Sequence, residues 1–511
     1  MTNATTIGGA LSGKALPVVT LGGAPLPQAA AHQLSRLVIR RALNVPALAE
    51  LTIEAPPPGF GQRCEAGLAL AVATADGRLL FRGTITGQEQ RYPAGGVSRL
   101  LVRAHDALHA LRLRRRFRVV ENARLTALWE EAAAELDFTF ACDEETPPRR
   151  FVQAGTSDLA ALLALGGEQG LYATLDGTCL RLVSLAGRED PRAYTWGKNL
   201  LEATIEKSGE QAARASRSRG WDPYSATSFS AEAALARQDQ SIDLDSYGLP
   251  ALEQDQGLLH ATNRPAGTQA ALEAQAQAAF DRAVARETVL RGTVLADPDL
   301  APGLRLRLDG LDTKTSPIGV VTEVVHHFDA ATGATSTFST ALPHEPEQLH
   351  APVVTLGEVT DIQDPEGGAR CKVKLPALGD LEPGFFSVLV AGAGAGKGAA
   401  VLPDVGDQVV VLFPQGDLAQ GIILGGLYGH ARLPRGTTTQ DKRALVLASG
   451  GNQRLVLGGQ QTLLSLSTQR GDLLQLGAAS KLVVAGDLTI AAVGGTLTIQ
   501  AARVQFERRT S

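Results

Sequence analysis

Hydrophobic residues recur in closely spaced pairs along the C-terminal part of the chain, from Arg443 to Phe506. In each pair a single residue separates two apolar residues, and the first members of successive pairs are 10, 9, 10, 8, 6, 9 and 7 residues apart. Small or polar residues, usually including glycine, separate the pairs, which is typical of turns. Because side chains alternate between the faces of a strand, each pair predicts a very short strand with both apolar side chains on one face. The pairs are Leu445/Leu447, Leu455/Leu457, Leu464/Leu466, Leu474/Leu476, Leu482/Val484, Leu488/Ile490, Leu497/Ile499 and Val504/Phe506.

A single ribbon of such strands would leave its edges unpaired and its apolar stripe in water. Three copies wound around a common axis would pair the edges and bury the stripes. The pattern therefore predicts a trimeric, triple-stranded β-helix over residues 443–511, with the pairs from Leu445 to Ile499 as its core. A monomeric solenoid and the edge of a β-sandwich are the alternatives for this stretch.

Strand-like apolar runs lie at both ends of the first 345 residues, and a mixed α/β region lies between them. Asp76-Gly77, flanked by two such runs, predicts a β-hairpin. Helical spacing predicts helices over 123–136, after Ser157, and over 268–286, with Asn122 and Thr268 as N-caps of the first and last. Residues 208–262 are polar and are expected to form an irregular connection. The expected strands are 37–39, 48–53, 68–74, 79–85, 288–295, 304–308 and 319–328.

Five further strand-like runs between Val353 and Tyr428 suit a small closed barrel of the OB type. Only a short polar linker, about 432–442, separates this barrel from the rod. The predicted fold class is mainly β with an α/β insert: two hub β-barrels, an OB-fold barrel and the trimeric β-helix. The predicted domains are a first hub barrel (1–120), a mixed α/β insert (121–287), second hub barrel strands (288–345), the OB barrel (352–431) and the spike (443–511).

Composition narrows the classes of function. The chain has 511 residues with 5% aromatics, so its cores must be built from Leu, Val and Ala. A formal net charge of −5 leaves no basic footprint for nucleic acid. Without a signal peptide or an apolar run near 18 residues, the protein is expected to be soluble and to begin in the cytoplasm. The four cysteines form no CxxC pair and are expected to be small buried hydrophobes.

Several motifs point to chemistry that their details do not support. The stretch 392–398, GAGAGKG, lacks the first glycine and the final Ser/Thr of a phosphate loop and is expected to be a flexible loop. His326 and His327 are adjacent in a strand, so they face opposite ways and cannot chelate one ion together. The acidic runs 130–131 and 143–145 offer no second carboxylate across a cleft. We therefore predict no catalytic residue, no cofactor and no metal site.

The stretch 112–118 carries five arginines in seven residues. With one aromatic residue and an acidic chain around it, a nucleic-acid patch is disfavoured. A solvated or inter-subunit strand face is expected instead, in contact with an acidic neighbouring subunit.

The residues 356–380, LGEVTDIQDPEGGARCKVKLPALGD, and 393–429, AGAGKGAAVLPDVGDQVVVLFPQGDLAQGIILGGLYG, resemble the OB module of VgrG proteins and of contractile-phage spikes. The stretch 151–172, FVQAGTSDLAALLALGGEQGLY, is similar to the hub part of that family. With the terminal repeats, the resemblance follows the family's order of hub, OB barrel and β-helix over nearly the whole chain.

The resemblance implies a structural homotrimer that joins the hexameric tail tube and baseplate to a puncturing tip and pierces the target envelope. In this family two similar barrels in each of three chains present a pseudo-sixfold ring to the tube. The compact hub, the short N-terminal lead and the absence of an inserted enzyme favour a phage-tail-like extracellular system, assembled in the bacterial cytoplasm. A type VI secretion spike carrying effectors is the alternative, and a trimeric β-helix enzyme or cell-wall hydrolase is a further one.

The end of the repeats predicts one more partner. Some members of this family close their tip with a histidine pair that holds iron, but residues 443–511 contain neither His nor Cys. The last pair, Val504 and Phe506, would leave a blunt apolar end. We expect a separate tip protein of the PAAR-repeat kind, carrying its own metal, to bind there.

Overall fold

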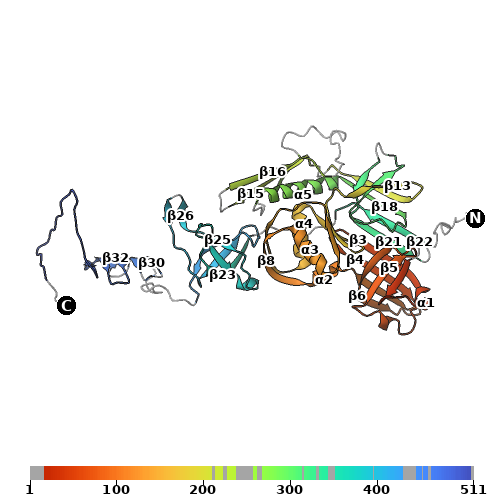
Figure 1. The fold of residues 1–511 in the computed structure, drawn as a ribbon, viewed down its shortest axis with the longest axis horizontal. Coiled ribbons are helices and arrows are strands. Elements are labelled where there is room, and N and C mark those ends of the chain that lie inside the picture. Colours follow the sequence, from red (N-terminus) through yellow and green to blue (C-terminus); the bar gives the residue numbers. More distant parts are fainter. Residues whose placement is uncertain are drawn as a thin grey trace, which may run out of the picture. The chain divides into compact units, whose positions relative to one another are not determined.

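The computed structural model describes residues 17–209, 213–222, 227–237, 257–261, 268–312, 316–329, 333–342, 352–394, 396–429, 445–449, 451, 453–458 and 462–507. The chain divides into two compact units, Met1–Gly426 and Leu427–Ser511. The predicted linker at 432–442 lies outside the described residues. The protein is mainly β, as predicted (Figure 1).

One mixed-order antiparallel sheet of eleven strands joins the two ends of the hub region. It brings the strands before residue 106 together with strands beyond residue 199, because β21 pairs with β3 along its whole length. The predicted hairpin at Asp76-Gly77 is confirmed as the β5–β6 pair. In sheet order the strands are β14 (Leu200–Lys207), β18 (Thr288–Leu295), β22 (Gly333–Ser339), β21 (Glu323–Asp329), β3 (Leu34–Ala42), β4 (Val45–Glu54), β7 (Arg99–His105), β6 (Leu79–Arg91), β5 (Ala69–Thr74), β1 (Pro17–Leu21) and β2 (Ala24–Pro25).

The predicted α/β insert is built around its own core of leucines, alanines and Trp129. Ser157 caps helix α4 by accepting a hydrogen bond from the Ala160 amide, which confirms the predicted helix start. Asn122 does not cap α3, because that helix begins at Leu125 and Arg124 is its N-cap. The elements are α2 (Leu108–Leu113), β8 (Arg115–Ala123), α3 (Leu125–Glu135), β9 (Thr139–Cys142), β10 (Arg149–Ser157), α4 (Asp158–Gln169), β11 (Tyr172–Asp176) and β12 (Cys179–Val183), and a short helix α1 (Gln28–Ala31) precedes them.

The expectation of an irregular connection over 208–262 was wrong for the residues that the structure describes. Strands β15 (Ala215–Asp222), β16 (Thr227–Ala233) and β17 (Leu258–Ala261) form a three-stranded sheet that packs on helix α5 (Gln269–Glu287). Small side chains such as Ala231 and Ala276 fill this contact, so the strands show no large apolar alternation in sequence. Thr268 caps α5 as predicted, by accepting from the Ala271 amide. A second three-stranded sheet contains β13 (Arg188–Thr195), β19 (Leu304–Asp309) and β20 (Ile318–Val320).

The block after Val353 forms the predicted five-stranded closed barrel. Its core includes Val359, Val373, Val411 and Phe413, which are almost fully buried. Its strands are β23 (Val353–Asp361), β24 (Cys371–Lys374), β25 (Phe385–Val388), β29 (Ile422–Leu427) and β28 (Gln408–Phe413). The stretch expected to be a flexible loop contains instead a two-stranded ribbon of β26 (Ala391–Gly394) and β27 (Lys397–Ala399).

The insert contacts the barrel through a small set of close contacts. Arg149, at the start of β10, forms ion pairs with Glu168 at 2.6 Å and with Asp417 of the barrel at 3.0 Å. Phe117 of β8 lies against Gly379, so closely that a Cβ at that glycine would be 2.4 Å from the Phe117 ring. Gly379 also has a φ of +71°, which favours glycine. The contacts between insert and barrel thus include the Phe117 ring, the Arg149 ion pairs and Arg150, which lies against Gly384.

We predict that Gly379→Ala destabilises the protein by more than about 2 kcal/mol, because it adds a clash with Phe117 to the strain of a positive φ. Gly367→Ala is the matched control: its φ is +69°, and nothing lies within 4 Å of the added methyl group. Its cost should be about 1–2 kcal/mol, from backbone strain alone. Urea unfolding of the full chain measures both, and equal losses would show that Phe117 does not seat the barrel.

Candidate functional site

The second unit contains a five-stranded antiparallel sheet formed by the first of the repeated pairs. Each strand pairs with the next along the chain, so the sheet is a simple meander. Backbone hydrogen bonds close two of the connections. The Ser449 amide donates to the Gln453 carbonyl, and the Thr468 amide donates to the Asp472 carbonyl, both at 3.0 Å. The strands are β30 (Leu445–Ala448), β31 (Arg454–Leu457), β32 (Thr462–Ser467), β33 (Leu473–Gly477) and β34 (Lys481–Val483).

The register of this sheet places the predicted leucines directly opposite one another. Directly paired residues share a face, so the leucines form two continuous rows on one face of the sheet. One row is Leu445, Leu457, Leu464 and Leu476, and the other is Leu447, Leu455, Leu466, Leu474 and Leu482. We call these nine residues the leucine face.

The leucine face is not buried within one chain. Six of its nine side chains are 38–56% exposed, whereas core residues of the barrel such as Val373 and Phe413 are 0% exposed. Opposite the leucine face, the same strands carry a more polar set, ending in Ser465, Gln475 and Lys481. A contiguous apolar surface of this kind is typical of an interface.

The later predicted pairs are not brought into this sheet. Val484 follows directly after β34, and the described residues 484–507 form no strand or helix (Figure 1). A short strand is stable only when a neighbour pairs with it, and within one chain these repeats pair with no described strand. Leu488, Ile490, Leu497, Ile499, Val504 and Phe506 are all at least half exposed. Their assignment to the trimer core and to tip binding stays a prediction.

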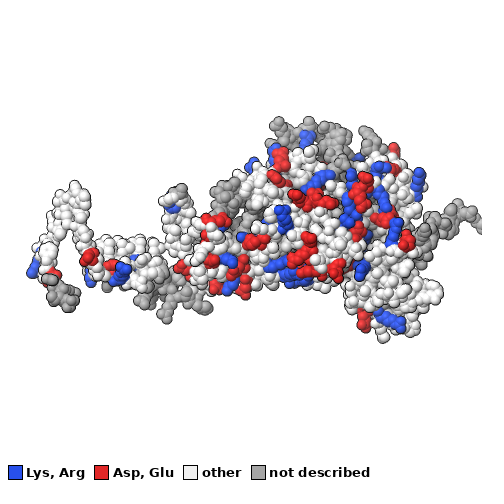
Figure 2. Space-filling view, in the orientation of Figure 1, with Lys and Arg blue, Asp and Glu red and all other residues white. Residues whose placement is uncertain are grey.

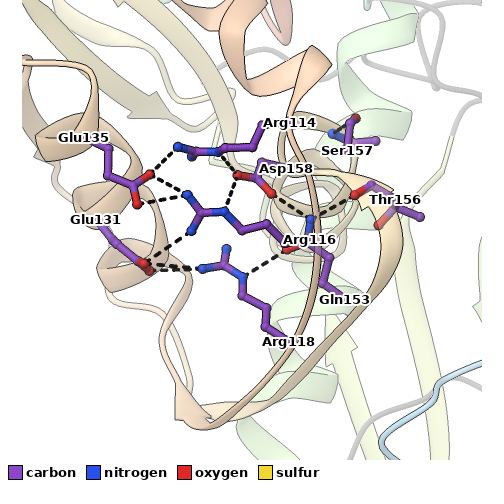
Figure 3. A network of polar contacts seen from close by, with 10 residues as sticks. Arg114, Arg116, Arg118, Glu131, Glu135, Gln153, Thr156, Ser157 and Asp158 are labelled. Carbon is purple, nitrogen blue, oxygen red and sulfur yellow. Dashed lines mark hydrogen bonds and ion pairs between the residues drawn. The ribbon is translucent and has the colours of Figure 1, made fainter. Parts of the chain in front are cut away.

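The arginine-rich stretch is the second candidate site that the sequence singled out. Alternation along the strand puts Arg114, Arg116 and Arg118 on one side, facing α3 and α4 (Figure 3). Arg114 and Arg116 both reach the Asp158 carboxylate, whose side chain is 1% exposed. The Gln153 amide donates a further hydrogen bond to this carboxylate at 2.8 Å.

Two glutamates of α3 complete this network on its solvent side (Figure 3). Glu135 accepts hydrogen bonds from Arg116 at 2.9 Å, and Glu131 pairs with Arg118 at 3.2 Å. The hydrogen bond to Glu135 raises the pKa of Arg116, so the pair stays charged at any physiological pH. Asp158 also begins α4, where a negative charge is favoured by the helix dipole.

The network shows that these three arginines find their acidic partners inside the chain. Arg114, Arg116 and Arg118 therefore do not need an acidic neighbouring subunit to balance their charge. Sequence reasoning missed the partners, although Glu131 and Glu135 are four residues apart and lie on one face of a predicted helix. On the face of the molecule in Figure 2, basic and acidic side chains of the hub are interspersed. This mixture agrees with a brace inside the insert rather than a binding patch.

Other candidates for chemistry are accounted for by packing. His326 and His327 do point opposite ways: His326 is buried beside Ser336 Oγ at 2.9 Å, and burial lowers its pKa to about 3. The cysteines Cys64 and Cys371 are buried, and burial raises the pKa of the Cys64 thiol to about 11. Among the described residues, no group of three or more His, Cys, Asp or Glu side chains is arranged to hold a metal ion. No helix in the described part of the chain has both the length and the apolar character needed to cross a bilayer.

Two family models match the sequence. Residues 355–428 match the type VI secretion system/phage-baseplate injector OB domain, which is the closed barrel described above. Residues 71–330, just over half of the chain, match the Alg8 N-terminal domain. No curated protein matches the sequence.

Solved structures of similar fold include a type VI secretion component and PdpA-VgrG complexes. One is the Escherichia coli c3393 protein, described as a component of the type VI secretion system with similarity to T4 tail proteins gp27 and gp5. It is 16% identical with a TM-score of 0.51, covering 80% of this chain and 99% of that one. The half-lidded Francisella PdpA-VgrG complex is 9% identical with a TM-score of 0.54, covering 91% and 87%. Its lidless form is 10% identical with a TM-score of 0.53, covering 93% and 100%.

The closed barrel is thus an injector OB domain of the type VI secretion and phage-baseplate kind, and the chain shares its fold with a type VI secretion component and with VgrG. The chain belongs to the family defined by the Alg8 N-terminal domain, and its overall fold is similar to that of VgrG.

The Asp158 network yields a stability prediction. Asp158→Ala should destabilise the hub by about 2–4 kcal/mol, because it leaves two arginines facing a site without its carboxylate. Glu131→Ala, which removes a carboxylate that is 48% exposed, should cost at most about 1 kcal/mol. Thermal and urea unfolding of the full chain compare the two variants, and a loss for Asp158→Ala no larger than for Glu131→Ala would contradict the brace.

Proposed function

We propose that the protein is the homotrimeric hub and spike of a contractile injection machine. In this proposal it joins a hexameric tail tube and baseplate to a puncturing tip and pierces the target envelope. It acts without catalysis, as a structural part, and it is assembled in the bacterial cytoplasm as a component of a tail-like particle of the extracellular kind.

The observation that carries the proposal is the leucine face. Nine leucines lie in register on one side of a sheet, and six of them stay at least 38% exposed among the residues that the structure describes. Fully burying one leucine side chain stabilises a protein by about 1.5–3 kcal/mol, so leaving this face in water forgoes a large stabilisation. A threefold arrangement covers each copy's face with those of the other two and requires no further partner.

The same arrangement accounts for the mechanical role. In the assembled rod, strands of three chains would be interlocked, so bending would break many hydrogen bonds together. The repeats beyond residue 484 find no pairing partner among the described residues of one chain, and neighbouring chains would supply it. The trimer core would then extend from the leucine face through Val484, Leu488, Ile490, Leu497 and Ile499.

A second candidate is a type VI spike that carries effectors. It is favoured by the relatives in fold, of which one is described as a component of that system and another as a PdpA-VgrG complex. Both candidates share the trimeric rod and differ in the cargo and in the particle around it. Electron micrographs of particles from the host would separate them.

We predict that Leu466→Asp disrupts the trimer, since three carboxylates would be placed in one apolar core at a cost of several kcal/mol. Gln475→Asp is the matched control, because Gln475 lies on the neighbouring strand but on the opposite face of the sheet. Sedimentation of both full-length variants at micromolar concentration measures the fraction of trimer. Equal behaviour of the two would show that the leucine face is not the core.

The end of the spike provides another prediction. Phe506 is 91% exposed, and we propose that Val504 and Phe506 bind a PAAR-like tip protein that carries its own metal. Removing residues 504–511 should abolish co-purification of this partner while the protein remains a trimer. Trimers that carry stoichiometric iron or zinc without a second polypeptide would contradict the proposal.

A further inference from the structure

The β26–β27 ribbon of the OB barrel is an arm without a core of its own. Ala391 pairs with Ala399 and Gly394 with Lys397, and every described residue of the two strands is exposed. In Figure 1 the ribbon extends away from the body of the barrel, and Lys397 is the one charged residue in the sequence of 391–399. An isolated two-stranded hairpin is at best marginally stable in water.

The chain flanking the ribbon is also apolar and exposed. Leu389, just before it, is 60% exposed, and Val401, just after it, is 67% exposed. Neither belongs to the barrel core, which is formed by other residues. The ribbon and its flanks therefore form an apolar arm that its own barrel does not cover.

The same barrel carries a matching surface on its outside. Val354 and Leu356 of β23 pair with Leu412 and Val410 of β28, and strand alternation turns all four away from the core. Val354 is 59% exposed and Leu356 is 54% exposed. Leu424 of the adjacent strand β29 extends this surface, since its neighbour Ile423 points into the core. We call these five residues the outer apolar face.

We propose that the ribbon of one copy packs on the outer apolar face of the next copy, so that three barrels are clasped head to tail around the trimer axis. The proposal rests on the trimer put forward above and assigns it a second interface. Because alanine and glycine are small, the ribbon's backbone can approach the sheet of the next copy closely.

A second copy of this chain is the partner that we expect on the outer apolar face. Only residues 428–444 lie between the barrel and the leucine face, so three leucine faces that meet hold three barrels at a high local concentration. Arm and face are different surfaces, which makes the contact heterologous, and a heterologous contact around a threefold axis closes into a ring.

The test is cross-linking of the full-length protein with a short bis-maleimide, after introducing Ala393→Cys in the ribbon together with Leu356→Cys on the outer face. Closed head-to-tail contact should give covalent dimers and trimers on a denaturing gel. Ala393→Cys with Thr355→Cys is the matched control, because residue 355 lies on the same strand and points the other way. This control, each single variant and the unmodified protein, which keeps its four native cysteines, should stay largely monomeric on the gel.

Three results would overturn the proposal while leaving the proposed function intact, provided that the unmodified protein sediments as a trimer. They are no cross-linking of the double variant, cross-linking only within one chain, and cross-linking of Ala393→Cys alone, which would mean that ribbons meet each other. An unmodified protein that sediments as a monomer would instead refute the proposed function, and this inference with it.

Discussion

The constraint on which the proposed assembly depends is an apolar face that the described residues of one chain leave exposed. Short strands of three to six residues bring nine leucines into two rows on one face of the sheet. A helix or a second sheet would bury such a face in an ordinary domain. Here the described residues that follow the sheet, 484–507, form no strand or helix, and the proposed trimer would supply the cover from other chains.

The hub must remain rigid where its α/β insert contacts the barrel. The insert buries Asp158 between Arg114 and Arg116, and breaking such a pair is costly because a charge is left without its partner. A few residues away on the same strand, Phe117 lies against Gly379 of the barrel. The polar brace and the aromatic contact thus occupy opposite sides of β8, which alternation along the strand makes possible.

Much of the fold could be predicted from the sequence, because the signals were local and periodic. The Asp76-Gly77 hairpin, the helix start after Ser157, the cap at Thr268 and the five barrel strands follow from turn chemistry and apolar spacing. The leucine pairs of residues 445–482 were predicted to share a face, and the register places them so. Whether three chains bury these leucines is a matter for the proposed trimer, because one chain shows only their register.

Other features depend on long-range contacts that local patterns do not encode. The sheet of β15–β17 is held by small residues against α5, so its strands look like a polar connection in sequence. In the sequence alone, Arg116 looks like a surface charge without a partner. The pairing of β8 with β10 brings Asp158, 42 positions later, beside it. The pairing of β21 with β3 joins segments nearly three hundred residues apart, and only the folded chain reveals it.

The central claim is that the leucine face is covered by two further copies of the same chain. Native mass spectrometry of the unmodified full-length protein tests it most directly, because it counts the chains in the particle. The account predicts a species of three times the 53.4 kDa chain mass that persists on dilution to micromolar concentration. A folded monomer as the main species at that concentration would contradict it.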